Sequence, residues 1–212
     1  MKNIQSTIII VLCTFTFSIC FYFLNELQKM KHNYNSNSKF TTKIQMKEDF
    51  LRLNFELNLK MTGLKAPDTD CVEVQKMRKN LYDIVNDKPL LIYRLNGSNC
   101  TTCNNDVLLQ LKNELLSIFS DDKMIVLSSQ HGKRDLLIFK RKNNIKFPIY
   151  LIPEKSFDWI VEEHSVPYFF VLHHDMKISH IYVPNNDYTD LNKLYLEEVK
   201  RFLSDGELIT GN

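Results

Sequence analysis

Two cysteines with the spacing C-x-x-C, Cys100 and Cys103, are the residues of this chain best suited to chemistry. An apolar, β-prone run (90–95) and a turn-forming cluster (96–99) precede them, and an amphipathic helical pattern (107–119) follows. A thiol at a helix N-terminus is favoured as thiolate by unpaired N–H groups and by the helix dipole. A second thiol about one turn further on can attack a mixed disulfide made by the first. The pattern therefore predicts a redox-active disulfide.

A lone C-x-x-C also resembles half of a zinc site. Structural zinc usually needs four ligands, and a second C-x-x-C or an H-x-x-x-H spacing would be expected downstream. No second cysteine pair follows Cys103. The histidines beyond it are His131, His164, His173, His174 and His180. We therefore favour redox chemistry, with no metal and no cofactor; unreactive cysteines are a further alternative.

The N-terminal region contains one long apolar stretch, residues 7–24, which carries no charge. Its 18 residues are at the short end of what spans a bilayer. No small-x-small cleavage pattern ends it. It therefore predicts an uncleaved transmembrane signal anchor after a short tail (1–6), with a cleaved signal peptide or a buried core helix as alternatives. The net charge of +2, without a basic run, does not support nucleic-acid binding.

Charges around this stretch do not settle its orientation. Lys2 lies on one side, whereas Lys29, Lys31, Lys39 and Lys43 lie on the other, which mildly opposes export of the C-terminal part. However, long domains translocate largely regardless of charge, and a tethered C-x-x-C domain is best suited to an oxidising compartment. We expect a single-pass membrane protein whose soluble domain is periplasmic or otherwise extracytoplasmic.

Residues 25–63 are predicted to be a linker and membrane-proximal segment. Its polar tract, residues 32–38, is typical of a flexible spacer. From Leu51 to Met61 apolar and polar residues alternate, which predicts a half-buried strand. These residues are not strong strand formers, so a membrane-proximal helix is the alternative. Gly63 marks the break that follows.

The remainder of the chain alternates between strand and helix patterns. Further strands are predicted at 124–127, 147–152, 168–172 and 178–183, the last two as a hairpin, and helical patterns at 77–85, near 136–139 and from 187–189 onward. Cys71 is interpreted as an isolated apolar residue near a strand, with a third redox cysteine as the alternative. The whole predicts an α/β sandwich around a mixed central sheet.

This order of elements, with Cys100-Thr101-Thr102-Cys103 and then Val166-Pro167, resembles the thioredoxin-like superfamily over residues 64–205. With the N-terminal anchor it is similar to the membrane-tethered TlpA/ResA-type oxidoreductases of bacteria. The resemblance implies that Cys100 is the nucleophile, Cys103 the resolving cysteine and Pro167 the family's cis-proline. It also implies that the backbone of Val166 pairs with a substrate strand. Residues 206–212 are expected to be a tail.

The chain departs from the family pattern at three places. Asn99 precedes the first cysteine where an aromatic residue is usual, and the dipeptide Thr101-Thr102 lacks the frequent proline. Arg94 stands six residues before Cys100, where thioredoxins have a buried carboxylate. A cation facing the site could lower a thiolate pKa. These departures concern the redox potential and the substrate more than the fold.

The resemblance implies a membrane-tethered enzyme that reduces or exchanges disulfides of exported proteins, using electrons from a membrane donor. Two alternatives come from other functional classes. A copper-binding metallochaperone would use Cys100, Cys103 and either His173 or His174. A non-catalytic thioredoxin-like binding module would keep its function without the two cysteines.

Overall fold

The computed structural model of the protein describes part of the 212-residue chain. The described residues are 26, 28, 29, 41–73, 78–86, 88–96, 115, 119, 123–129 and 132–209, of which 205–209 are described without their side chains. The chain divides into two compact units, Met1–Arg52 and Leu53–Asn212. The predicted anchor, residues 7–24, lies outside the described residues. Within them, no helix combines the length and the apolar character needed to cross a membrane.

A seven-stranded mixed sheet forms the centre of the second unit, in the order β2-β1-β5-β4-β3-β6-β7. Its strands are β1 (Asp70–Glu73), β2 (Arg78–Asn80), β3 (Leu90–Leu95), β4 (Met124–Ser128), β5 (Ile149–Leu151), β6 (Tyr168–Leu172) and β7 (Ile178–Tyr182). Strands β3, β4 and β5 are parallel, and the other neighbouring pairs are antiparallel. The helices with described bounds are α2 (Leu81–Val85), α4 (Lys133–Lys142), α5 (Ile160–Glu163) and α6 (Thr189–Ile209). The predicted α/β sandwich with a mixed sheet flanked by helices is confirmed.

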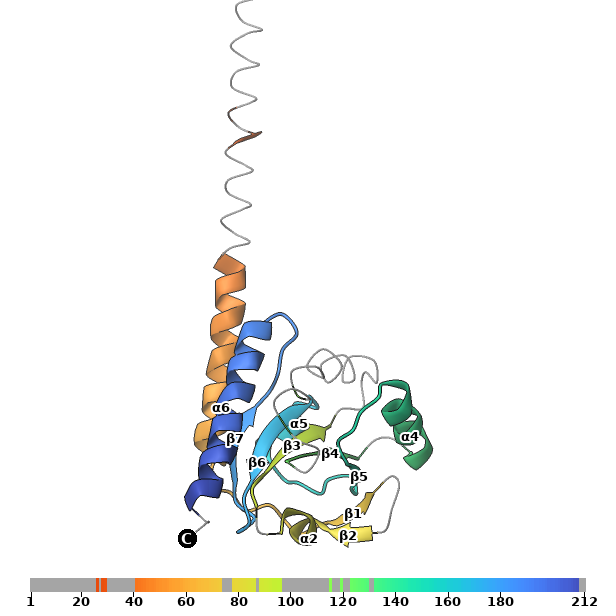
Figure 1. The fold of residues 1–212 in the computed structure, drawn as a ribbon. Helices are drawn as coiled ribbons and strands as arrows, with labels where there is room; N and C mark the ends of the chain where they lie inside the picture. Colours follow the sequence, from red (N-terminus) through yellow and green to blue (C-terminus); the bar gives the residue numbers. More distant parts are fainter. Residues whose placement is uncertain are drawn as a thin grey trace, which may run out of the picture. The chain divides into compact units, whose positions relative to one another are not determined.

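The central strands are apolar along almost their whole length, apart from Arg94 in β3 and Ser128 in β4. Every residue of β3, β4 and β6 is buried, as expected for strands covered on both faces. On one face Phe170 packs against Trp159, which belongs to the segment before α5. On the other face Tyr93 contacts Phe169, which in turn contacts Tyr195 of α6. Figure 1 shows α6 alongside β6 and β7, with α4 toward the β5 side of the sheet.

The outer edge of β7 is closed by side-chain amides from a helix that runs to residue 61. Asn54 accepts a hydrogen bond from the main-chain N–H of Val183 (2.7 Å) and donates to its carbonyl oxygen (3.3 Å). Asn58 accepts from the N–H of Ile181 (3.0 Å) and donates to the carbonyl oxygen of the same residue. Main-chain groups of residues 63–66 pair with the beginning of the strand. The two asparagines therefore replace a neighbouring strand and protect an edge that would otherwise be open to pairing.

The strand predicted from Leu51 to Met61 is wrong: these residues are helical. Leu57 and Met61 are buried at helical spacing, whereas Phe55 and Leu59 are 63% and 69% exposed. The alternation arose because apolar residues occupy two faces of the helix and only one of these faces is packed. The alternative, a helix, is the state that the structure adopts.

Most of the other predicted elements agree with the structure. The strand at 90–95 is β3, the predicted hairpin is β6 and β7, and the last helix begins at Thr189. The helical pattern at 77–85 is only partly correct, because Arg78–Asn80 form β2 and the helix begins at Leu81. The compact unit begins at Leu53, and α6 extends to Ile209.

Candidate functional site

The carboxyl end of β3 is the part of the described structure closest in sequence to the C-x-x-C. Cys100 and Cys103 themselves lie outside the described residues. Arg94 of β3 pairs with Tyr168, the first residue of β6. Asn96, the last described residue before the cysteines, donates from Nδ2 to the carbonyl oxygen of Glu162 at 3.2 Å. The strand that leads into the C-x-x-C therefore ends beside α5 and the beginning of β6.

Val166 and Pro167 directly precede β6 and so lie at this same end of the sheet. Pro167 is buried, and Val166 is partly buried against the core. No peptide bond among the described residues is cis, so the bond between them is trans and the expected cis-proline is not observed. The trans form is the favoured state of X–Pro bonds. Their proposed contact with a substrate stays a prediction.

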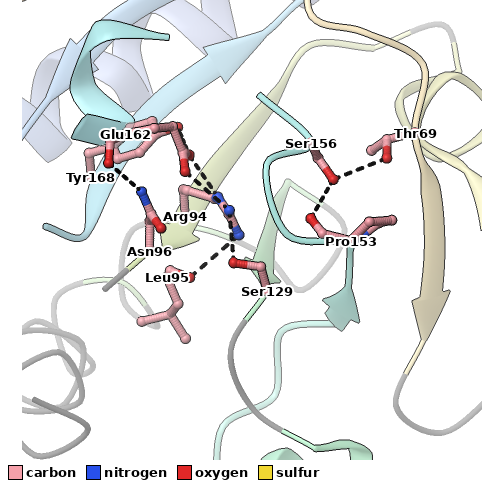
Figure 2. A network of polar contacts seen from close by, with 9 residues as sticks. All are labelled: Thr69, Arg94, Leu95, Asn96, Ser129, Pro153, Ser156, Glu162 and Tyr168. Atoms are coloured by element: carbon pink, nitrogen blue, oxygen red, sulfur yellow. Dashed lines mark hydrogen bonds and ion pairs between the residues drawn. The ribbon is translucent and has the colours of Figure 1, made fainter. Parts of the chain in front are cut away.

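A buried ion pair occupies the core at this end of β3 (Figure 2). The side chain of Arg94 is fully buried and donates from Nε to Oε1 of Glu162 (2.9 Å) and from a terminal nitrogen to Oε2 (3.3 Å). The same terminal nitrogen donates to Oγ of Ser129 at 3.0 Å. The guanidinium also lies over the ring of Phe157, 5.6 Å from its centroid. Tyr168 completes the network by donating from its hydroxyl to Oε1 of Glu162 at 2.6 Å.

The network pairs the buried charge at this end of the sheet. One cation faces one carboxylate, in bidentate geometry that suits the planar guanidinium. Burial and the Glu162 carboxylate raise the pKa of Tyr168 well above its usual value, so the phenol stays protonated and donates. Arg94 is therefore bound to a carboxylate within the core.

Sequence reasoning identified Arg94 but missed Glu162. The two residues are 68 positions apart, and Glu162 stands in a four-residue helix with another glutamate beside it. One signal was available: a charged residue in the middle of an apolar strand requires a partner, because an unpaired buried charge is very costly. The partner's identity depends on how α5 folds over the sheet.

Cys71 lies in β1, which β5 and β4 separate from β3. Its side chain is fully buried, and burial, with help from Asp68 and Asp70, raises its pKa to about 12. Because the thiolate is the reactive form, this thiol is unreactive at neutral pH. The interpretation as an isolated buried residue is supported over that of a third redox cysteine.

We therefore expect the Cys71 thiol to resist iodoacetamide at pH 7 in the folded protein and to react once the protein is unfolded in urea. Mass spectrometry of peptides labelled before and after unfolding measures this directly. Labelling of Cys71 in the native protein, at a rate near that of a free thiol, would contradict the assignment.

His173 and His174 follow β6 at the end of the sheet opposite to Leu95. The register pairs Leu172 with Leu90, the first residue of β3, whereas the C-x-x-C follows the last residue of that strand. The register of β3 and β6 therefore gives no support to a copper site that combines one of these histidines with Cys100 and Cys103.

An open cleft of about 1000 Å³ also lies in the second unit. Trp159 and Met176 form part of its buried floor, and its rim carries charges of both signs, among them Lys155. Neither Arg94 nor Pro167 lines it. One aromatic contact links the cleft to the network at the end of β3: Trp159 stacks on Phe157, the ring over which the Arg94 guanidinium lies.

Comparison with known proteins identifies the fold. No protein-family model and no curated protein matches the sequence. Among solved structures, the chain is similar to a candidate protein disulfide isomerase from Bacteroides thetaiotaomicron, with a TM-score of 0.52 and 15% identity over 69% of this chain and 92% of that one. It is also similar to a candidate electron transfer protein from Aquifex aeolicus VF5, with a TM-score of 0.50 and 14% identity over 64% and 93% of the two chains. At these identities the likeness concerns the fold alone: the chain has a thioredoxin-like fold, a mixed sheet flanked by helices.

Proposed function

We propose that this protein is a thiol–disulfide oxidoreductase in which Cys100 and Cys103 form the redox-active disulfide. The observation that carries the proposal is the register between β3 and β6. It brings the strand that leads into the C-x-x-C beside the segment that contains Val166 and Pro167. The thioredoxin-like fold supports the same chemistry, although only by analogy.

The proposed reaction has two exchange steps. The Cys100 thiolate attacks one sulfur of a substrate disulfide, forming a mixed disulfide and releasing the other substrate sulfur as a thiolate. The Cys103 thiolate then attacks Sγ of Cys100, which breaks the mixed disulfide and releases the second substrate thiolate. The substrate gains two electrons, and the protein is left with a Cys100–Cys103 disulfide. Val166 is proposed to hold the substrate strand beside Pro167.

The proposed setting is a membrane surface outside the cytoplasm. Residues 7–24 would anchor the chain, disulfides of exported proteins would be the substrates, and a membrane-bound thiol donor would return two electrons to the Cys100–Cys103 disulfide. The uncharged length of the anchor segment and the C-x-x-C support this setting.

The first test is a redox titration of the full-length chain against a series of glutathione or dithiothreitol mixtures, with free thiols counted by mass labelling. We expect a reversible two-electron couple between Cys100 and Cys103, and we expect the Cys71 thiol to stay reduced throughout the titration. A strongly negative potential would identify a reductase, and a high one an oxidase or isomerase.

Matched variants test the order of the two steps. Cys103→Ser should accumulate covalent complexes with a disulfide-bearing substrate, because the mixed disulfide can no longer be resolved. Cys100→Ser should accumulate none, and Cys71→Ser should behave as the unmodified protein. Absence of a reversible couple, or full function in the variant lacking both Cys100 and Cys103, would reject the enzyme and favour a non-catalytic binding module.

A further inference from the structure

Helix α4 and the residues that follow it concentrate positive charge that the overall charge of +2 conceals. Residues 133–146 contain six Lys and Arg side chains but a single carboxylate, so the rest of the chain is net negative. Five of the six cations are exposed, and within the part of the chain that the structure describes none of the five forms an ion pair. These five are Lys133, Arg134, Arg141, Lys142 and Lys146, called here the basic face.

The stability of α4 explains only part of this arrangement. Arg141 and Lys142 lie in the last turn, where the negative end of the helix dipole favours cations. Lys133 and Arg134 lie in the first turn, where the same dipole disfavours them. The cations of the first turn therefore lower the stability of the helix, and their place on an exposed surface indicates a role in binding.

An apolar side chain stands among these cations. Ile138 is 53% exposed, although the neighbouring Leu136 packs into the core. Arg134 precedes Ile138 by four residues, and Arg141 and Lys142 follow it by three and four, so all of them share one side of the helix. The outward side of α4 thus presents one aliphatic group surrounded by positive charge.

We propose that the basic face binds the surface of a membrane that contains anionic phospholipids. The cations pair with lipid phosphates, and Ile138 enters the boundary between the headgroups and the acyl chains. Clusters of about four to eight Lys and Arg side chains on a helix are typical of segments that bind acidic lipids. The proposal does not rest on the predicted anchor or on the redox chemistry, since electrostatic attraction to the surface requires neither.

The composition of the face favours lipid over two other anionic partners. The centre of a protein–protein interface is depleted of lysine and enriched in aromatic residues, whereas three of the five cations here are lysines. Nucleic acids are bound through phosphates together with polar or aromatic contacts to the bases, and Ile138 offers neither kind of contact. A lipid surface makes use of both the charges and the aliphatic side chain.

The test measures how fast lysine side chains are acetylated in the full-length chain reconstituted into vesicles. One set of vesicles contains phosphatidylcholine alone, and the other contains phosphatidylcholine and phosphatidylglycerol. We expect Lys133, Lys142 and Lys146 to react at least about threefold more slowly on the anionic vesicles, because a surface potential of about −30 mV raises the local proton concentration by that factor and keeps the amines protonated. Lys193 and Lys200 of α6, both exposed, are controls in the same sample and should react equally on both.

Variants that leave the reporting lysines in place test the cause of this protection. The double variant Arg134→Gln, Arg141→Gln should lose most of it, and Ile138→Ser should lose part. Arg201→Gln on α6 is the matched control and should keep all of it. About 1 M NaCl should abolish the protection, because it shortens the Debye length to about 3 Å.

The reversible couple of Cys100 and Cys103 should be the same in every variant, so a failure here is distinct from a failure of the redox proposal. Equal acetylation on both kinds of vesicle, or protection that survives the double variant, would overturn the lipid proposal. Duplex DNA is added to the neutral vesicles as a competing partner and should give no protection. Protection by DNA as strong as that by phosphatidylglycerol would assign the basic face to nucleic acid instead.

Discussion

Replacing Arg94 with methionine is expected to lower the free energy of unfolding by about 3–5 kcal/mol. The substitution keeps the length of the buried stem but leaves the Glu162 carboxylate, only 13% exposed, without its cation. Tyr168 donates a single hydrogen bond to that carboxylate and cannot replace the bidentate pair. Chemical denaturation in urea at pH 7 measures the loss.

Two comparisons isolate the ion pair as the cause. The double variant Arg94→Met, Glu162→Met removes both charges together and should recover most of the lost stability, because an apolar replacement of a buried pair is often neutral. Arg201→Met removes a pair with Glu198 in which the side chains are 71% and 51% exposed, and should cost less than about 1 kcal/mol. If the double variant were as unstable as Arg94→Met alone, the changed shape of the side chain at position 94, and not the loss of charge pairing, would explain the lower free energy of unfolding.

Replacing Asn54 with alanine is expected to cost about 2–4 kcal/mol. Asn54 is 7% exposed, and its amide satisfies both the N–H and the carbonyl of Val183. Removing it leaves two main-chain groups at a buried sheet edge without these partners, and each unsatisfied group costs roughly 1–3 kcal/mol. Unfolding in urea measures the loss, and faster exchange of the Val183 amide hydrogen should accompany it.

Asn54→Leu separates hydrogen bonding from space filling, because leucine has the same branched arrangement of side-chain heavy atoms, with methyl groups in place of the amide, and is a better helix former. It should destabilise the protein about as much as alanine does. Lys60→Ala, at an exposed position of the same helix, should change stability by less than about 0.5 kcal/mol. A stable Asn54→Leu protein would show that the amide bonds to β7 are dispensable.

The elements whose signal is local in the sequence could be predicted before the structure was known. Continuous apolar runs predicted β3, β4 and β6, since strands buried on both faces need no polar positions. A short turn between two β-prone runs predicted the β6–β7 hairpin, and an amphipathic stripe predicted α6. The spacing of Cys100 and Cys103 gave the candidate chemistry, which no described residue yet tests.

Features that depend on contacts between residues far apart in the sequence could not be predicted in this way. Leu51–Met61 alternates as a strand does, yet it is a helix. Its buried face includes Asn54, whose hydrogen-bond partner lies 129 residues away in the sequence, and no local pattern indicates this contact. The partner of Arg94 likewise follows from how α5 packs. Local periodicity records which side chains are apolar, whereas the pairing of a buried polar group is set by whatever the folded chain brings within hydrogen-bonding distance.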